Sequence, residues 1–165
     1  MLSRADLCTA ADRDRIRGQI GAVAGGKPIV LAEHRPASLL SAGGQVSMIE
    51  PLAGRTVAAF CGIGNPAAFW QTLSRLGCRL AGTRVFPDHH AYSRADLAGL
   101  DSWTAQLQPE VVITTQKDLV KIPADELGRR PLLALRIEAS VEDPEGHLDR
   151  ALGRLPAGAP ATRAA

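Results

Sequence analysis

The stretch TVAAFCGIGNPAAFWQTLSRL, Thr56 to Leu76, decides the fold expected for this chain of 165 residues. Its first six residues, up to Cys61, form a continuous apolar run, which is typical of a strand buried on both faces of a sheet. A glycine turn follows, and Asn65 then stands as a helix cap with Pro66 at the first helical position. The stretch therefore predicts a strand, a tight turn and a helix, the repeating unit of an α/β protein.

The same alternation continues on both sides of this stretch. Short apolar runs predict four further strands, at Pro28–Ala32, Arg79–Phe86, Val111–Thr115 and Leu132–Ile137. Caps and apolar residues at helical spacing predict three further helices, at Thr9–Ala24, Ser93–Leu107 and Asp143–Leu155. Strands and helices in this order predict an α/β fold with an open, mostly parallel sheet and flanking helices.

Composition limits the classes of function. The net charge is +2, the basic residues are scattered and only 4% of residues are aromatic, so we expect no nucleic-acid partner. No apolar run approaches the roughly 18 residues of a spanning helix, and no signal-peptide pattern is present. The sequence is typical of a soluble protein of the cytoplasm, and no group of residues has the spacing of a metal site.

The motif CGIGNP, which begins at Cys61, lies where the first strand meets its helix. Gly62 and Gly64 allow a tight turn that exposes backbone amides, and a helix capped by Asn65 favours an anion at its N-terminus. We expect these three residues to bind substrate or phosphate. The alternative is an ordinary strand-to-helix turn, and the Gly-Lys-Ser/Thr of a Walker A loop does not follow.

The motif PDHHAYS follows the strand predicted at Arg79–Phe86. Loops at the carboxyl ends of strands line the ligand crevice of a doubly wound sheet. An aspartate beside a histidine can orient its ring, and histidine titrates near neutral pH. We therefore expect Asp88 and His89 to act in proton transfer, with His90 near the substrate. The alternative is a surface loop in which Asp88 caps a turn, and Ser93 reads as the cap of the next helix.

The motif TTQKDLVK follows the strand that ends at Thr115. Its hydroxyls, its lysine and its acid gather at another strand end, and Lys117 could contact phosphate as a point charge. We expect Thr115, Lys117 and Asp118 to bind substrate or phosphate. In the alternative, Lys117 and Asp118 form a solvated pair at a polar strand end.

These motifs, in this order, resemble the C-terminal half of the tetraacyldisaccharide 4′-kinases, the lipid A 4′-kinases. The resemblance runs from Ser3 to about Leu155. The matching segments are SRADL (3–7), AFCGIGNPAAFWQTLSRLG (59–77), TRVFPDHHAYSRADL (83–97), VVITTQKDLVKI (111–122) and PLLALRIE (131–138).

The resemblance implies a phosphotransferase of lipid A biosynthesis. Such an enzyme moves the γ-phosphate of ATP, with Mg²⁺, to the 4′-hydroxyl of tetraacyldisaccharide 1-phosphate. It works in the cytoplasm at the surface of the inner membrane, so the partners would be this acylated disaccharide and the membrane. His89 would pair with an aspartate of an N-terminal lobe and deprotonate the sugar hydroxyl.

The resemblance also implies a domain division. Residues 1–40 would be a remnant of an N-terminal P-loop lobe and 55–156 a C-terminal α/β lobe. Weak alternation after Gly43 and Gly44 favours a linker hairpin at 41–54, and an Ala/Pro/Gly-rich composition predicts a flexible tail at 157–165. Since the family's Walker A loop precedes the matching region, we expect an N-terminally truncated or split kinase. Gln116 stands where the family usually has Glu, and Leu119 where it usually has Ala.

Two other classes of function stay open from the sequence. The first is a non-catalytic lobe that binds the acylated acceptor. The second is a DHH-type metal phosphoesterase, suggested by Asp88-His89-His90. The second would need two metals and further aspartates at neighbouring strand ends, and no Asp-x-Asp pair is found at the end of a predicted strand.

Overall fold

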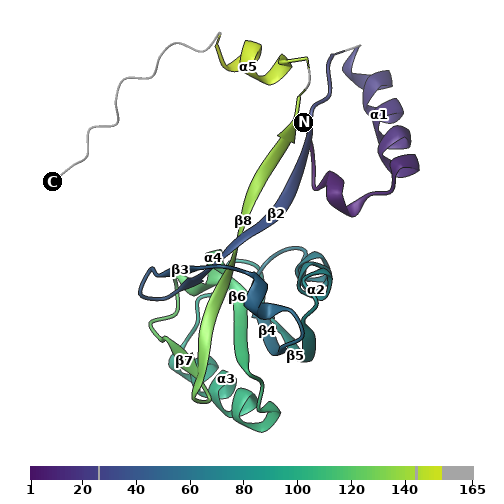
Figure 1. Ribbon diagram of the computed structural model, residues 1–165. Coiled ribbons are helices and arrows are strands. Elements are labelled where there is room, and N and C mark those ends of the chain that lie inside the picture. The colour runs from purple at the N-terminus through teal and green to yellow at the C-terminus, as the bar shows by residue number, and fades with distance from the viewer. Residues whose placement is uncertain (26, 144, 154–165) are drawn as a thin grey trace, which may run out of the picture. The chain divides into compact units, whose positions relative to one another are not determined.

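The computed structural model describes residues 1–25, 27–143 and 145–153 (Figure 1). The chain forms two compact units, one made of residues 1–35 and 139–165 and the other of Pro36–Glu138. We call them the terminal unit and the central unit. Their bounds differ from those of the domain division expected from the sequence, which stays a prediction, and the segment 157–165 lies outside the described residues.

The elements alternate along the chain between strands and helices. The helices are α1 (Ala10–Ala24), α2 (Pro66–Arg75), α3 (Arg94–Leu107), α4 (Gln116–Leu119) and α5 (His147–Leu152), with 3-10 turns at Ala5–Leu7 and Glu50–Leu52. The strands are β1 (Leu2–Ser3), β2 (Leu31–Ser41), β3 (Val46–Ser47), β4 (Thr56–Cys61), β5 (Arg79–Val85), β6 (Val111–Thr115), β7 (Glu126–Leu127) and β8 (Arg130–Glu142).

The strands form one sheet in the order β1-β2-β8-β6-β4-β5, with β3 paired to β2 and β7 to β8. The pairs β1–β2, β6–β8, β4–β6 and β4–β5 are parallel. The short strands β3 and β7 add two antiparallel pairs. The expected α/β fold with a mostly parallel sheet and flanking helices is therefore confirmed.

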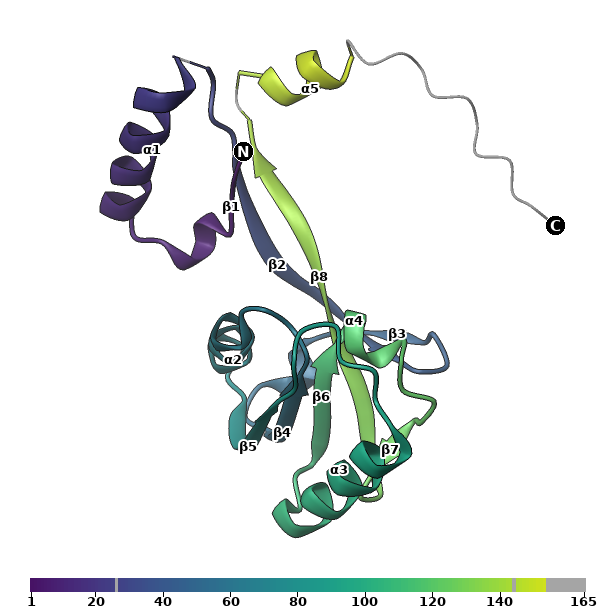
Figure 2. The same ribbon diagram turned by 180° about the vertical axis from the view of Figure 1, so that it is seen from behind.

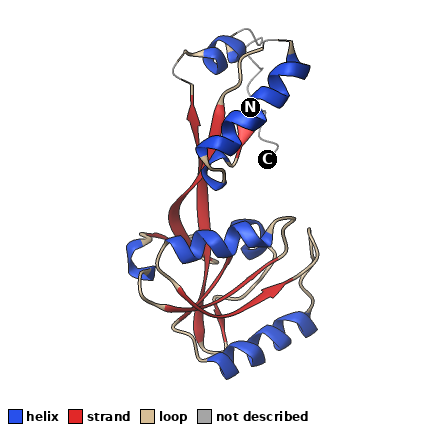
Figure 3. Cartoon of the chain, turned by 90° about the vertical axis from the view of Figure 1, so that its right-hand side faces the viewer, coloured by secondary structure: helices blue, strands red, loops and turns tan. Residues whose placement is uncertain are grey.

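The core of the central unit occupies both faces of this sheet. Val57 and Ala59 of β4 pack in one cluster with Phe69 of α2. Phe60, which lies between them in the sequence, packs in the other cluster with Leu100 of α3. Helices α2 and α3 thus cover opposite faces (Figure 3), which explains why β4 is an unbroken apolar run.

Local signals placed most helix ends correctly. Asn65 accepts the amide of Ala68 at 3.1 Å, and Ser93 and Asp96 form a capping box on α3. The start of the last helix was predicted wrongly. The helix begins at His147, because Gly146 adopts a left-handed conformation at φ 64°, and Asp143 accepts the His147 amide from outside the helix.

The sequence also underestimated two strands and missed short elements. The strand predicted at 28–32 begins only at Leu31, and the strand predicted at 132–137 begins at Arg130; both extend further along the chain through charged residues. These strands are neighbours in the sheet order, and their backbone pairing does not depend on an apolar pattern. The single-turn helix α4 has too few residues to show a helical period.

The parallel direction of β4, β5 and β6 places their carboxyl ends at one edge of the central unit. The loop 62–65 follows β4, the segment 86–92 follows β5, and α4 follows β6. Figure 2 shows α4 at the end of β6, with the chain beyond β4 and β5 running nearby. All three motifs singled out in the sequence lie at this edge.

Candidate functional site

Hydrogen bonds and close packing join the three strand-end segments. The Phe86 amide donates to the carbonyl of Cys61 at 2.8 Å. The Gly62 amide donates to Asp118 Oδ2 at 2.9 Å. A Cβ on Gly62 would lie 3.0 Å from the carbonyl oxygen of Pro87, so only glycine fits this approach without displacement. The structure therefore brings the three predicted motifs together.

Asp88, His89 and Lys117 form a polar cluster at this junction. Lys117 Nζ donates to Asp88 Oδ1 at 2.8 Å and lies 3.4 Å from His89 Nε2. The Lys117 hydrogen bond is the main reason why the pKa of Asp88 is below its usual value. The His89 side chain is 76% exposed. The cluster thus offers an accessible imidazole next to an anchored carboxylate and a cation.

His90 lies in different surroundings from His89. Its ring stacks on Phe86 with centroids 4.8 Å apart, and its Nε2 lies 3.1 Å from Asp96 Oδ2. His89 adopts a left-handed backbone at φ 61°, which is uncommon for a residue with a side chain. Of the two histidines expected at the site, His89 is therefore open to a ligand, and His90 holds contacts within the protein.

Asp118 is fully buried, although it stands beside the exposed Lys117. Its Oδ2 accepts the Thr115 hydroxyl at 2.7 Å as well as the Gly62 amide. Burial first, and the negative charge of Asp118 second, raise the pKa of Cys61 to about 11. The alternative of a solvated Lys117–Asp118 pair is wrong, because Lys117 contacts Asp88 and Asp118 is turned inward.

Gly64 and Asn65 lie exposed at the N-terminus of α2. Asn65 serves as the helix cap. A Cβ on Gly64 would lie 3.6 Å from Asp88 Oδ2, so this turn passes next to the polar cluster. A ligand that contacts His89 can therefore also reach the α2 N-terminus, where a helix favours negative charge.

Lys121 is a residue of this region that the sequence interpretation missed. Its Nζ donates to the carbonyl of His90 at 3.0 Å and lies 3.7 Å from Asp118 Oδ1. The sequence signal that could have identified Lys121 is its position three residues after Asp118, because opposite charges at this spacing are neighbours on a helical turn. Gln116, the first residue of α4, is exposed.

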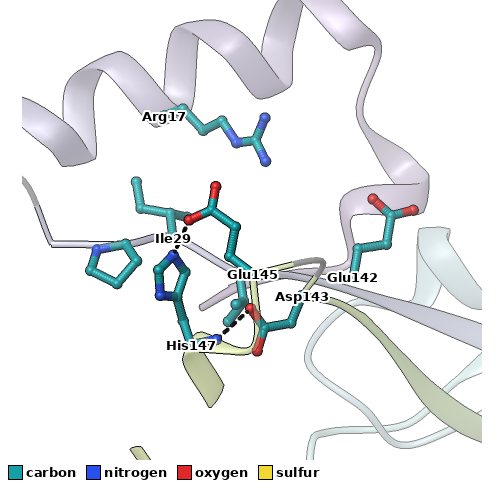
Figure 4. A pocket seen from close by; sticks show the side chains of 8 residues that line it. Arg17, Ile29, Glu142, Asp143, Glu145 and His147 are labelled. Atoms are coloured by element: carbon teal, nitrogen blue, oxygen red, sulfur yellow. Dashed lines mark hydrogen bonds and ion pairs between the residues drawn. The ribbon is translucent and has the colours of Figure 1, made fainter. Parts of the chain in front are cut away.

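The terminal unit holds a cavity of about 520 Å³ (Figure 4). Arg17 of α1 and the charged residues before α5 line it, and Glu145 Oε2 pairs with His147 Nε2 at 2.8 Å. None of the site residues expected from the sequence lines this cavity. Asp143, which also lines it, accepts the backbone amide of His147 at 2.8 Å.

Two further properties concern the described part of the chain. Within residues 1–25, 27–143 and 145–153, no three His, Cys, Asp or Glu side chains are grouped so that they could hold a metal ion. In the same ranges, no helix is both long and apolar enough to cross a bilayer.

Comparison with known proteins connects this arrangement to a family. The family model described as tetraacyldisaccharide-1-P 4′-kinase, LpxK, matches residues 1–155. The chain is 40% identical over 140 residues to a protein named tetraacyldisaccharide 4′-kinase of Methylobacterium nodulans, covering 85% of this chain and 37% of that protein. A relative of the same name from Methylobacterium radiotolerans is 38% identical over 142 residues, covering 86% of this chain and 42% of the relative.

A solved structure is similar as well. It is described as the "apo" form of LpxK from Aquifex aeolicus in complex with ATP, with a TM-score of 0.51 and 25% identity, covering 78% of this chain and 36% of that one. The chain thus spans well under half the length of the relatives it matches. Since the family model matches nearly all of its residues, the chain belongs to the tetraacyldisaccharide-1-P 4′-kinase family.

Proposed function

We propose that this chain supplies the proton-accepting half of a kinase site. The kinase would transfer the γ-phosphate of ATP to the 4′-hydroxyl of tetraacyldisaccharide 1-phosphate, a precursor of lipid A. One observation carries the proposal. The exposed ring of His89 lies beside Asp88 and Lys117, where three strand ends meet. Family membership supports this chemistry, and two relatives carry the corresponding name.

The geometry supports a different role for each residue of the site. His89, in its neutral form, accepts the proton of the sugar hydroxyl, and Asp88 holds the loop backbone by accepting the His89 amide at 2.9 Å. Lys117 exchanges its bond to Asp88 for a phosphate oxygen of a substrate. Gly64 and Asn65 place the α2 N-terminus beside the same anion, with Thr115 and His90 at the border of the site.

ATP and Mg²⁺ are both part of this proposal, but the support for ATP is stronger than the support for Mg²⁺. The similar LpxK structure from Aquifex aeolicus is a complex with ATP, and Lys117 offers this chain a contact to a phosphate. The carboxylates of the site do not suit Mg²⁺, since Asp88 is bonded to Lys117 and Asp118 is buried among donors. We therefore assign no step to the metal. The reaction would take place at the cytoplasmic surface of the inner membrane.

A chimera tests the function. Residues 1–155 of this chain replace the matched segment in the Methylobacterium nodulans relative, and transfer of labelled γ-phosphate to tetraacyldisaccharide 1-phosphate is measured. We expect transfer by the chimera. An inactive, folded chimera beside an active native relative would contradict the proposed function.

The variant His89→Asn then tests the assigned role. Asparagine tolerates a left-handed backbone, so the variant keeps the fold. We expect turnover to fall by about 10²–10⁴, the usual contribution of a general base. The matched control is Arg136→Met, which removes an exposed ion pair with Glu138 elsewhere in the central unit and should leave turnover unchanged.

A further inference from the structure

Asp118 carries a charge in a place that solvent does not reach, since its exposed fraction is 0%. A buried carboxylate is costly unless donors and an opposite charge surround it. Its Oδ2 accepts from the Gly62 amide and the Thr115 hydroxyl, and its Oδ1 lies 3.7 Å from Lys121 Nζ. These neighbours come from the loop after β4, the end of β6 and the turn after α4.

Lys121 extends this contact to the histidine segment. Its side chain is 27% exposed, and its ammonium donates to the backbone carbonyl of His90 at 3.0 Å. That carbonyl belongs to the residue directly after His89. One ion pair therefore touches the segments that follow β4, β5 and β6.

We infer that Asp118 and Lys121 are positioning residues that hold the His89 segment against the Gly62 loop, and that neither side chain contacts a substrate. Direct phosphate binding by Asp118 is disfavoured, because its carboxylate is negative and buried, and its Oδ2 already accepts two hydrogen bonds. Lys121 is held between Asp118 and the His90 carbonyl. The inference rests on the proposed function in one respect, the role of His89 as the proton acceptor. The positioning of the segment by Asp118 and Lys121 does not depend on that role.

Hydrogen exchange on the folded chain tests this inference without any turnover. The double variant Asp118→Asn/Lys121→Met removes both charges together, so neither is left buried and unpaired. The probe is the His90 amide, which donates to the Pro87 carbonyl at 3.1 Å. The reference is the Glu110 amide, which donates to Thr56 at 2.8 Å in the same unit. We expect the ratio of the two rates to rise about tenfold or more, the effect of losing a charge-assisted hydrogen bond.

A change in this ratio reports the loss of a local contact and not a loss of overall stability, because a global loss of stability accelerates the exchange of both amides alike. The control Arg136→Met should leave the ratio unchanged. An unchanged ratio in the double variant would overturn the inference. If the double variant does not fold, the same ratio of exchange rates is measured in Lys121→Gln, and an unchanged ratio there would overturn the inference.

The chimera described above adds a functional readout. We expect the double variant to lower kcat while KM stays near the parent value, because the substrate contacts remain and the proton acceptor is displaced. A rise in KM with unchanged kcat would overturn the inference, since it would mean that the pair contacts the substrate. If the parent chimera does not transfer phosphate, the proposed function fails, and the exchange ratio still decides the role of the pair.

Discussion

His89 and His90 show how backbone conformation separates two neighbouring residues of one type. His89 has a positive φ and an exposed ring, whereas the His90 ring packs against Phe86 and Tyr92 and contacts Asp96. Burial first, and Asp118 second, raise the pKa of Tyr92, so its phenol stays neutral. The aromatic side of the segment 86–92 is thus held by packing within the protein, and its polar side carries His89.

The Lys117–Asp88 bond makes a prediction about pH at the residue scale. Lys117→Met should raise the pKa of the Asp88 carboxyl toward its ordinary value, because the hydrogen bond from Lys117 is the largest cause that lowers it. The measurement is an NMR titration of the Asp88 carboxyl carbon. Arg136→Met is the control that should leave this pKa in place, and an unchanged titration in Lys117→Met would contradict the bond.

Two glycines of one loop form a matched pair for a second prediction. Gly62→Ala should destabilise the protein by about 1–3 kcal/mol, because the new Cβ would lie 3.0 Å from the Pro87 carbonyl and 3.2 Å from Asp118 Oδ1. Gly64→Ala should cost much less, since its nearest neighbour would be 3.6 Å away. Urea unfolding of both variants measures the difference. Equal losses would mean that the loop is not packed as described.

At the scale of elements, α3 depends on its first turn. Asp96 accepts from the Ser93 hydroxyl and amide and contacts His90, and these bonds, Ser93 first, lower the pKa of Asp96 to about 2. A lowered carboxyl pKa stabilises the fold above the ordinary value of 3.8. This contribution is lost as the pH falls from about 4 to about 2.

Asp96→Asn should therefore lower stability at pH 7 and remove part of the acid sensitivity between these two pH values. Urea midpoints of the central unit, measured at several pH values, give both effects. Asp12→Asn is the matched control, because Asp12 stands in the same capping position on α1, which has no buried residues. If Asp96→Asn keeps the full acid dependence, the assigned cause is wrong.

The sequence predicted those elements whose signals are local. The cap residues Asn65 and Ser93 predicted the starts of α2 and α3, and the continuous apolar run of β4 predicted a buried strand. The direction of the strands then placed the three motifs at one edge. The partner of Lys117 was not predictable in this way, because Asp88 lies 29 residues away and the adjacent Asp118 was the obvious candidate. Tertiary packing alone decided which of the two acids is buried.

At the scale of the whole molecule, the two units differ in what they bury. Both hydrophobic clusters lie within the central unit. Among the described residues, the buried hydrophobic side chains of the terminal unit are those of Ala5, Leu31 and Ala32. Because local stability follows buried apolar contact, the amides of α1 should exchange faster than those of β4 and β6.

The last prediction separates the stabilities of these units. Leu132→Ala should destabilise the central unit by about 2–5 kcal/mol, because Leu132 is fully buried in the cluster beneath α3. Exchange at β4 and β6 should accelerate accordingly, whereas α1, whose exchange reflects local opening, should keep its rates. Ile137→Ala is the matched control on the same strand, since Ile137 is 47% exposed and loses little burial. If Leu132→Ala accelerates α1 as much as β4, the chain unfolds as one cooperative body, and the loops that carry His89 share their stability with the terminal unit.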